Sequence, residues 1–267
     1  LSMVTAKEDL LQLFCQLGLN ITDDVMVHSS MRSLGYVVNG AVDVIDALIT
    51  VVGLDEGTIL MPAHTGQLSD PSGWSSPPLE KESIAIVKEK MNPLDLKLTP
   101  VRGRGVIAQS FLSYAGVKRS DHPLNSVSAL GKRASFYTSS HSFDEPEGLD
   151  SPIGRLYENN GKVLGIGVGV PRFTAIHLAE YIADVAYLKV DNPSVLFKRE
   201  NQKNIFKRIK KYPGESDRFT NILPILRKQQ LITELEFNGH VMTSLSIKPA
   251  IDCIVNTLDK NPLFLIS

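Results

Sequence analysis

Polar side chains that could handle a proton share one face of a predicted helix. Thr174, His177 and Glu180 recur at intervals of three residues, and Tyr181 follows directly. At 3.6 residues per turn these positions fall on one side of a helix, whereas the apolar residues between them fall on the sides that pack. A carboxylate beside an imidazole fixes its tautomer and makes it more basic, which suits a general base.

Two other interpretations fit the same spacing. Thr174 could be the N-cap of an ordinary helix with a surface His–Glu pair, because such pairs are common three residues apart. His177 and Glu180 are also half of a zinc site of the HxxE type, which needs a third ligand from a distant part of the chain. Neither an HxH nor a CxxC pattern occurs in the sequence, and we expect no metal.

A second candidate site is the loop that follows the first predicted strand. The run from His28 to Gly40 is rich in serine and glycine and leads into a helix. Hydroxyls and backbone N–H groups in such a loop can bind a phosphate or pyrophosphate. The patterns GxxxxGK[ST], GxGxxG and GxSxG are all absent, which argues against a P-loop, a Rossmann dinucleotide site and an α/β-type serine hydrolase. The RGRG run at 102–105 lacks the spacing of the acetyl-CoA loop of GNAT acyltransferases.

Hydrophobic patterns predict the elements that position these residues. Apolar runs at 25–27 and 58–61 indicate buried strands, and 42–52 indicates a helix between them. A second strand–loop–helix unit covers 163–170 and 174–187. This alternation is typical of an α/β fold with a parallel sheet, which binds its ligands at the carboxyl ends of the strands.

Length and composition indicate one globular domain. The chain has 267 residues, of which 43% are hydrophobic, and its formal net charge is −1. These values exclude a disordered chain and a generally basic nucleic-acid binder. Two cysteines cannot build a disulfide scaffold, and we expect no signal peptide, no membrane span and a cytoplasmic location. We predict a single domain over 1–267 with an elaborated C-terminal part, in which 190–245 is a strand-rich insertion or edge. The basic run at 198–211 is expected to be a solvated face.

Seven ordered segments carry a resemblance to a known family. They are VMVHSSMRSLG (25–35) with NGA (39–41), GTILMP (57–62), DPSGW (70–74), TPVRGRGVIAQSF (99–111), KRSDHPLNSVSALG (118–131), SPIGRLY (151–157) and TAIHLAEY (174–181). In this order they resemble the aminoglycoside 3-N-acetyltransferase family, which is distinct from the GNAT enzymes. The resemblance implies a three-layer α/β/α sandwich with a largely parallel central sheet. It also implies acetyl transfer from acetyl-CoA to an amine.

The resemblance assigns roles by position. His177 matches the family's catalytic histidine and Glu180 its carboxylate partner, in a direct transfer within a ternary complex. Thr174, one turn earlier, is expected to orient the base or stabilise the tetrahedral oxyanion. The residues that the resemblance implies for coenzyme A are His28, Ser29, Ser30, Ser33, Leu34, Gly35, Val37, His122, Pro123, Ser126 and Val127.

The acceptor is expected to be a small-molecule amine, in the first place the 3-amino group of an aminoglycoside. It would enter near Asp70, Trp74, Asp144 and Glu145. Aminoglycosides are polycations, whereas this chain is almost neutral, so another amine stays open as the acceptor. A zinc hydrolase and a catalytically silent CoA-binding relative also stay open. We expect no nucleic-acid or membrane partner, and either a monomer or a homodimer.

Overall fold

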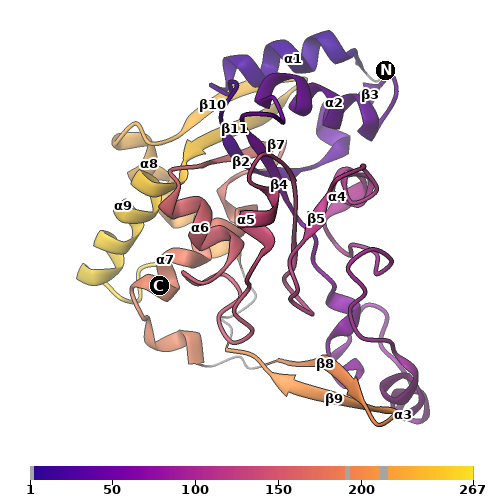
Figure 1. Cartoon of the computed structure of the whole chain (residues 1–267). Coiled ribbons are helices and arrows are strands. Elements are labelled where there is room, and N and C mark those ends of the chain that lie inside the picture. Colours follow the sequence, from indigo (N-terminus) through magenta and orange to yellow (C-terminus); the bar gives the residue numbers. More distant parts are fainter. Residues whose placement is uncertain (1–2, 190–192, 211–215, 267) are drawn as a thin grey trace.

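The structure is a computed structural model that describes residues 3–189, 193–210 and 216–266. The predicted domain of 1–267, the predicted insertion at 190–245 and the basic run at 198–211 therefore each include residues outside that description. Within the described ranges the chain folds around a seven-stranded sheet (Figure 1). No helix in these ranges is long and apolar enough to cross a lipid bilayer.

The central sheet is mixed. In spatial order its strands are β10 (Thr233–Phe237), β11 (His240–Ser246), β7 (Lys162–Ile166), β2 (Asp24–Ser29), β4 (Thr58–Pro62), β6 (Val127–Gly131) and β5 (Lys118–Arg119). Only β2 pairs in parallel, with β4 on one side and β7 on the other. The remaining neighbours are antiparallel. The prediction of a largely parallel sheet is therefore wrong.

Short connections explain two of the four antiparallel pairs of this sheet, β5–β6 and β10–β11. Parallel neighbours need a crossover of about a dozen residues or more, and β2, the helix α2 (Ala41–Val52) and β4 form such a unit. In contrast, seven residues (120–126) join β5 to β6. Asn238 and Gly239, both with positive φ, join β10 to β11. An Asn-Gly pair between two strands is a strong signal for an antiparallel hairpin, and the predicted parallel sheet did not take it into account.

Helices pack on both faces of the sheet, because successive strand residues point to opposite sides. On one face, Val25, Val27 and Leu164 contact a group of three helices: α1 (Lys7–Gln16), α2 and α4 (Gly105–Phe111). On the other face, Met26 and Val163 contact a second group: α5 (Ala134–Thr138), α6 (Pro152–Glu158), α7 (His177–Ile182), α8 (Leu223–Lys228) and α9 (Ile247–Lys260). The predicted proton-handling helix, α7, belongs to this second group.

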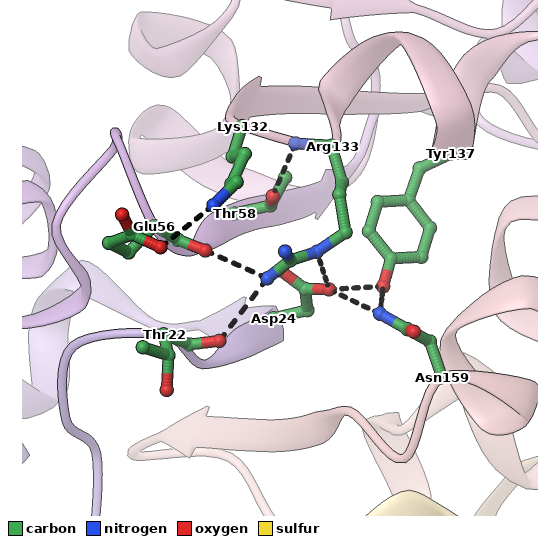
Figure 2. A network of polar contacts seen from close by, with 8 residues as sticks. All are labelled: Thr22, Asp24, Glu56, Thr58, Lys132, Arg133, Tyr137 and Asn159. Atoms are coloured by element: carbon green, nitrogen blue, oxygen red, sulfur yellow. Dashed lines mark hydrogen bonds and ion pairs between the residues drawn. The ribbon is translucent and has the colours of Figure 1, made fainter.

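A buried carboxylate ties the sheet to two helices at the start of β2 (Figure 2). Asp24 accepts hydrogen bonds from the Arg133 Nε and Nη2 atoms at 2.6 and 2.8 Å. It also accepts from the Tyr137 hydroxyl at 2.5 Å and from Asn159 Nδ2 at 2.7 Å. The Arg133 backbone N–H in turn donates to Thr58 Oγ1 in β4. This network joins β2, β4, α5 and the end of α6, and it lies at the opposite end of β2 from His28.

A separate hairpin accounts for most of the basic run. Strands β8 (Ser194–Glu200) and β9 (Lys203–Arg208) pair with each other and lie against α3 (Lys81–Lys90), at the lower right of Figure 1. Arg199 and Asn204 donate hydrogen bonds to the carbonyl of Met91, directly after α3. Part of this basic run therefore caps a helix, which the prediction of a purely solvated face did not include. A further two-stranded parallel pair joins β1 (Val4–Thr5) to β3 (Tyr36–Val37).

Candidate active site

His177 and Glu180 form a hydrogen-bonded pair in the interior. A 3-10 turn over Thr174–Ile176 leads into α7, which begins at His177. The Nδ1 atom of His177 lies 2.8 Å from Glu180 Oε2. His177 is 7% exposed and Glu180 is 0% exposed, so the alternative of a surface pair is wrong. Thr174 is also buried and is not an N-cap. Phe173 occupies the N-cap position of the 3-10 turn, and Ile176 occupies that of α7.

Three side chains occupy both oxygens of the Glu180 carboxylate. Oε2 accepts from His177 and from Arg218 Nη2, the latter at 3.2 Å. Oε1 accepts from Arg218 Nη1 and from the Tyr187 hydroxyl. Burial alone would raise the pKa of Glu180, but the hydrogen bonds and charges of His177 and Arg218 outweigh it and lower that pKa. Glu180 is therefore an ionised carboxylate in a dry environment.

This arrangement can supply a general base. An ionised carboxylate only accepts hydrogen bonds, so the Nδ1 atom of His177 carries the proton that it donates to Glu180. The lone pair of the neutral imidazole then lies on Nε2, which is the atom that can take a proton from a substrate. The carboxylate also stabilises the imidazolium that forms when it does.

A cavity of about 520 Å³ opens at the carboxyl ends of β2 and β4. The predicted loop residues His28, Ser29 and Ser30 line it, together with residues 103–108, which include the start of α4. Three arginines also line it, namely Arg32, Arg104 and Arg172. A cavity with this many cations suits a ligand that carries phosphate groups.

His28 connects this cavity to the helix that carries His177 and Glu180. Its ring stacks on Phe173 at a centroid distance of 5.5 Å, and Phe173 directly precedes the turn that leads into α7. Burial, together with the nearby charge of Arg104, lowers the pKa of His28 to about 3. His28 is therefore neutral near pH 7, and its buried Nε2 atom has no hydrogen-bond partner among the residues that the structure describes.

The other residues predicted to bind coenzyme A form two groups. One group follows Ser30 along the same loop, and the other is a separate cluster. Ser33 and Leu34 are buried, Val37 pairs with Thr5 in the small sheet, and the Ser33 hydroxyl donates to the Ser30 carbonyl. Gly35 has a φ of +72°, and a Cβ there would lie 2.4 Å from the Met3 carbonyl oxygen, so the backbone itself requires a glycine.

His122, Pro123, Ser126 and Val127 form the second cluster, between β5 and β6. His122 Nδ1 accepts the backbone N–H groups of Leu124 and Asn125, and Ser126 donates to the Ala63 carbonyl. The Pro123 carbonyl accepts from Thr65, and Val127 is in β6. None of these residues is among those that line the large cavity. A direct role toward coenzyme A stays a prediction for both groups.

Two of the four residues predicted for the acceptor form ion pairs with lysines of the chain itself. Asp70 pairs with Lys88 and Glu145 with Lys210, each at 2.7 Å. The Trp74 indole donates to Ser69 Oγ, while the Asp144 side chain is exposed. Asp70 also lines a cavity of about 460 Å³ that has Arg208 on its wall. The predicted acceptor region thus carries both charges.

The described residues contain no cluster of three or more His, Cys, Asp or Glu side chains that could hold a metal ion. A zinc site built on His177 and Glu180 would need a third such ligand. Within the described part of the chain, Glu180 is instead neutralised by Arg218.

Sequence reasoning missed Arg218, Tyr187 and the cavity arginines. Arg218 is 38 residues from Glu180 and belongs to a separate 3-10 helix, η7 (Ser216–Ile222), so no spacing pattern connects the two. Arg104 belongs to the RGRG run, whose spacing does not match a GNAT loop. The signal that could have found it is its position before a helix and within one of the seven family segments.

Comparison with known proteins identifies the family of the chain. A sequence model of the family described as aminoglycoside 3-N-acetyltransferase matches residues 26–259. The SPbeta prophage-derived aminoglycoside N(3')-acetyltransferase-like protein YokD of Bacillus subtilis (strain 168) is 43% identical over 177 residues, which are 66% of this chain and 64% of YokD. The matched stretch thus spans less than two thirds of the length of this curated relative.

Solved structures show the same fold over nearly the whole chain. The crystal structure of YokD has a TM-score of 0.88 at 32% identity, and the match covers 97% of this chain and 95% of that one. A histidine-to-alanine variant of aminoglycoside acetyltransferase AAC(3)-IVa in complex with a gentamicin has a TM-score of 0.82 at 25% identity, with coverages of 99% and 92%. AAC-IIIb, solved as a binary complex with CoASH, has a TM-score of 0.81 at 24% identity and coverages of 97% and 97%.

The resemblance carried by the seven sequence segments is thereby confirmed by an independent sequence model and by the fold. The family match extends through the strands of the central sheet and through the helix that carries His177 and Glu180. The chain belongs to the aminoglycoside 3-N-acetyltransferase family.

Proposed function

We propose that this chain is an acetyl-CoA-dependent N-acetyltransferase that transfers acetyl directly to an amine, in the first place the 3-amino group of an aminoglycoside. The observation that carries the proposal is the buried pair of His177 and Glu180, with 2.8 Å between Nδ1 and Oε2. An imidazole whose tautomer and orientation are fixed by an ionised carboxylate is the arrangement that a general base needs.

In the proposed step, the neutral amine nitrogen attacks the thioester carbonyl carbon of acetyl-CoA. A C–N bond forms, and Nε2 of His177 takes the proton that the nitrogen loses. The tetrahedral intermediate then collapses, the C–S bond breaks, and the proton passes to the departing sulfur. The products are the N-acetylated amine and the free thiol of coenzyme A. Thr174, one helical turn before the base, is placed to steady the oxyanion or to orient the imidazole.

Acetyl-CoA is proposed to bind in the cavity at the ends of β2 and β4. Arg32, Arg104 and Arg172 offer cations to its phosphate groups, and Ser29 and Ser30 offer hydroxyls and backbone donors. AAC-IIIb, which has the same fold, is a protein solved with CoASH. The stacking of His28 on Phe173 connects this cavity to the turn before His177, which would bring the thioester end of the ligand toward the base.

A second acceptor class is favoured by the acceptor-side ion pairs. AAC(3)-IVa, the neighbour solved with a gentamicin, supports an aminoglycoside. Here, however, Asp70 and Glu145 are each neutralised by a lysine, and Arg208 lines the cavity beside Asp70. A less cationic amine would meet less repulsion at such a site, so the same chemistry on a non-aminoglycoside amine is the alternative.

The test is thiol release from acetyl-CoA with a panel of aminoglycosides and unrelated primary amines. Wild type and His177→Ala are compared, and acetyl-CoA affinity is measured for both by calorimetry. Loss of at least about a hundredfold in turnover with affinity retained would support His177 as the base. Activity on non-aminoglycoside amines alone would select the second acceptor class. Acetyl-CoA binding without turnover on any amine would contradict the proposed activity.

A further inference from the structure

We propose that Arg218 is a positioning residue that keeps Glu180 ionised and oriented, so that His177 is a neutral base near pH 7. This inference deepens the proposed function and rests on it for its catalytic meaning. The geometry that supports it stands on its own.

The contact between Arg218 and Glu180 is bidentate and buried. Nη1 donates to Oε1 and Nη2 to Oε2 of the carboxylate, and the Arg218 side chain is 9% exposed while that of Glu180 is 0% exposed. A bidentate pair fixes the plane of the carboxylate as well as its position. Because His177 shares Oε2 with Arg218, the orientation of the imidazole depends on that plane.

Aromatic rings hold the guanidinium in place. Its carbon lies 4.7 Å from the ring centroid of Phe219 and 5.6 Å from that of Tyr187. The same Phe219 ring packs edge-on against His177 at 4.7 Å, and the Tyr187 hydroxyl donates to Glu180. Arg218, Phe219 and Tyr187 thus form one support around the His177–Glu180 pair.

Charge balance predicts what this support does. With Arg218 present, the Glu180 carboxylate already interacts with a cation. It therefore stabilises the protonated form of His177 less than it would without Arg218. Without Arg218, the buried carboxylate would depend on His177 for positive charge among its described hydrogen-bond partners, and the imidazole would keep its proton to higher pH. Of the other ionisable groups nearby, Tyr187 donates a neutral hydroxyl to Glu180. Tyr181 donates to the Lys210 carbonyl, and burial, together with the charges of Glu147, Glu145 and Glu180, raises its pKa.

The experiment follows the His177 imidazole by NMR in protein labelled at histidine nitrogens, with His177→Asn used for assignment. In wild type we expect the neutral ring to be the Nδ1–H tautomer. In Arg218→Met we expect the titration midpoint of His177 to rise by about one pH unit or more. In Arg218→Lys, which retains the charge, it should stay near the wild-type value.

Two comparisons separate an electrostatic role from a loss of structure. Arg227 makes a similar two-oxygen contact with Glu234 at an exposed site, so Arg227→Met should leave the His177 titration unchanged. In a Glu180→Gln background, Arg218→Met should produce no further shift, because the effect passes through Glu180. An unchanged midpoint in the folded Arg218→Met single variant would overturn the proposal.

Activity gives a second, separate readout. If an acceptor is found, the acid limb of the kcat profile should move to higher pH in Arg218→Met by the same amount as the NMR midpoint. It should return toward wild type in Arg218→Lys. A shifted NMR midpoint with no activity in wild type would retain the role of Arg218 and refute only the proposed function. A lowered kcat with an unmoved profile and midpoint would mean that Arg218 is merely structural.

Discussion

Thr174 lies one turn before His177, and the reaction it would serve predicts a specific kinetic signature. The side chain is buried, so its hydroxyl would meet the reacting groups in a site shielded from water. Interactions made only in the transition state lower kcat when they are lost, and leave ground-state binding intact. Thr174→Val preserves the shape of the side chain and removes the hydroxyl. We expect kcat to fall by about ten- to a hundredfold with little change in either KM, and an unaltered kcat would contradict this role.

His28 predicts a loss of stability in acid. Its folded pKa is lowered to about 3, mainly by burial and then by Arg104, whereas an unfolded histidine titrates near 6.5. Below about pH 6.5 the unfolded chain therefore binds a proton that the folded chain excludes. Stability from this group is fully present above about pH 6.5 and falls as the pH drops toward about 3. Between pH 7 and pH 5 one such residue removes about 2 kcal/mol from the free energy of unfolding.

Denaturant titrations at pH 7 and pH 5 measure that loss. We expect His28→Leu to lose about 2 kcal/mol less than wild type between the two pH values. His141, whose pKa burial and His122 also lower to about 3, is retained in both proteins and cancels in the comparison. His240→Gln, at an exposed position on β11, is the control and should behave as wild type. If wild type and His28→Leu lose the same free energy of unfolding between pH 7 and pH 5, the assigned effect of burial on His28 is contradicted.

The sequence was informative about residues wherever neighbours in space are also neighbours along the chain. His177 and Glu180 are three residues apart, so the helical period alone brings them together. Arg218 reaches Glu180 across 38 residues and from a separate 3-10 helix, and no periodicity describes that approach. The ion pair of Asp70 with Lys88 was not predicted for the same reason. In this pair the lysine compensates the negative charge of an acidic residue of the predicted acceptor region.

At the scale of elements, the Asp24 network stabilises the fold at a distance from the candidate site. It ties β2, β4 and α5 together at the opposite end of β2 from His28 (Figure 2). Arg133→Met would leave a buried carboxylate without its cation, and breaking such a pair costs about 3–5 kcal/mol. We expect the free energy of unfolding to fall by about that amount. Because the network is far along β2 from the cavity, acetyl-CoA affinity of the folded variant should stay unchanged, and calorimetry at low temperature checks this.

Element prediction succeeded where one local pattern decides the structure. The apolar runs at 25–27 and 58–61 with the helix between them match β2, α2 and β4, since each has its own hydrophobic period. The relative direction of the strands was predicted wrongly, because it depends on connection length and turn type. The Asn238-Gly239 turn indicates an antiparallel hairpin, and β10 and β11 form one in which β10 is an edge strand of the central sheet and β11 pairs with β7.

The whole molecule is almost neutral, with a net charge of −1, so its overall field cannot attract a polycation over long distances. Attraction must come from local groups, because only charges within about a Debye length, roughly 10 Å, are felt strongly. Near the predicted acceptor region those groups are the exposed Asp144, then Asp70 and Glu145, each paired with a lysine, and Arg208. Affinity for a polycationic amine should therefore be limited by these compensating cations.

Removing one of those cations tests this limit. Lys88→Gln releases Asp70 from its ion pair, which is partly exposed. We expect the KM for an aminoglycoside to fall by about three- to fivefold at low salt, since a solvent-accessible pair is worth up to about 1 kcal/mol. Lys132→Gln, which releases Glu56 from a similar 2.7 Å pair, makes the same change in net charge beside the Asp24 network and is the matched control. A gain confined to Lys88→Gln that disappears near about 0.5 M salt would place the acceptor beside Asp70. If both variants shift KM equally, net charge alone is responsible and the acceptor binds elsewhere.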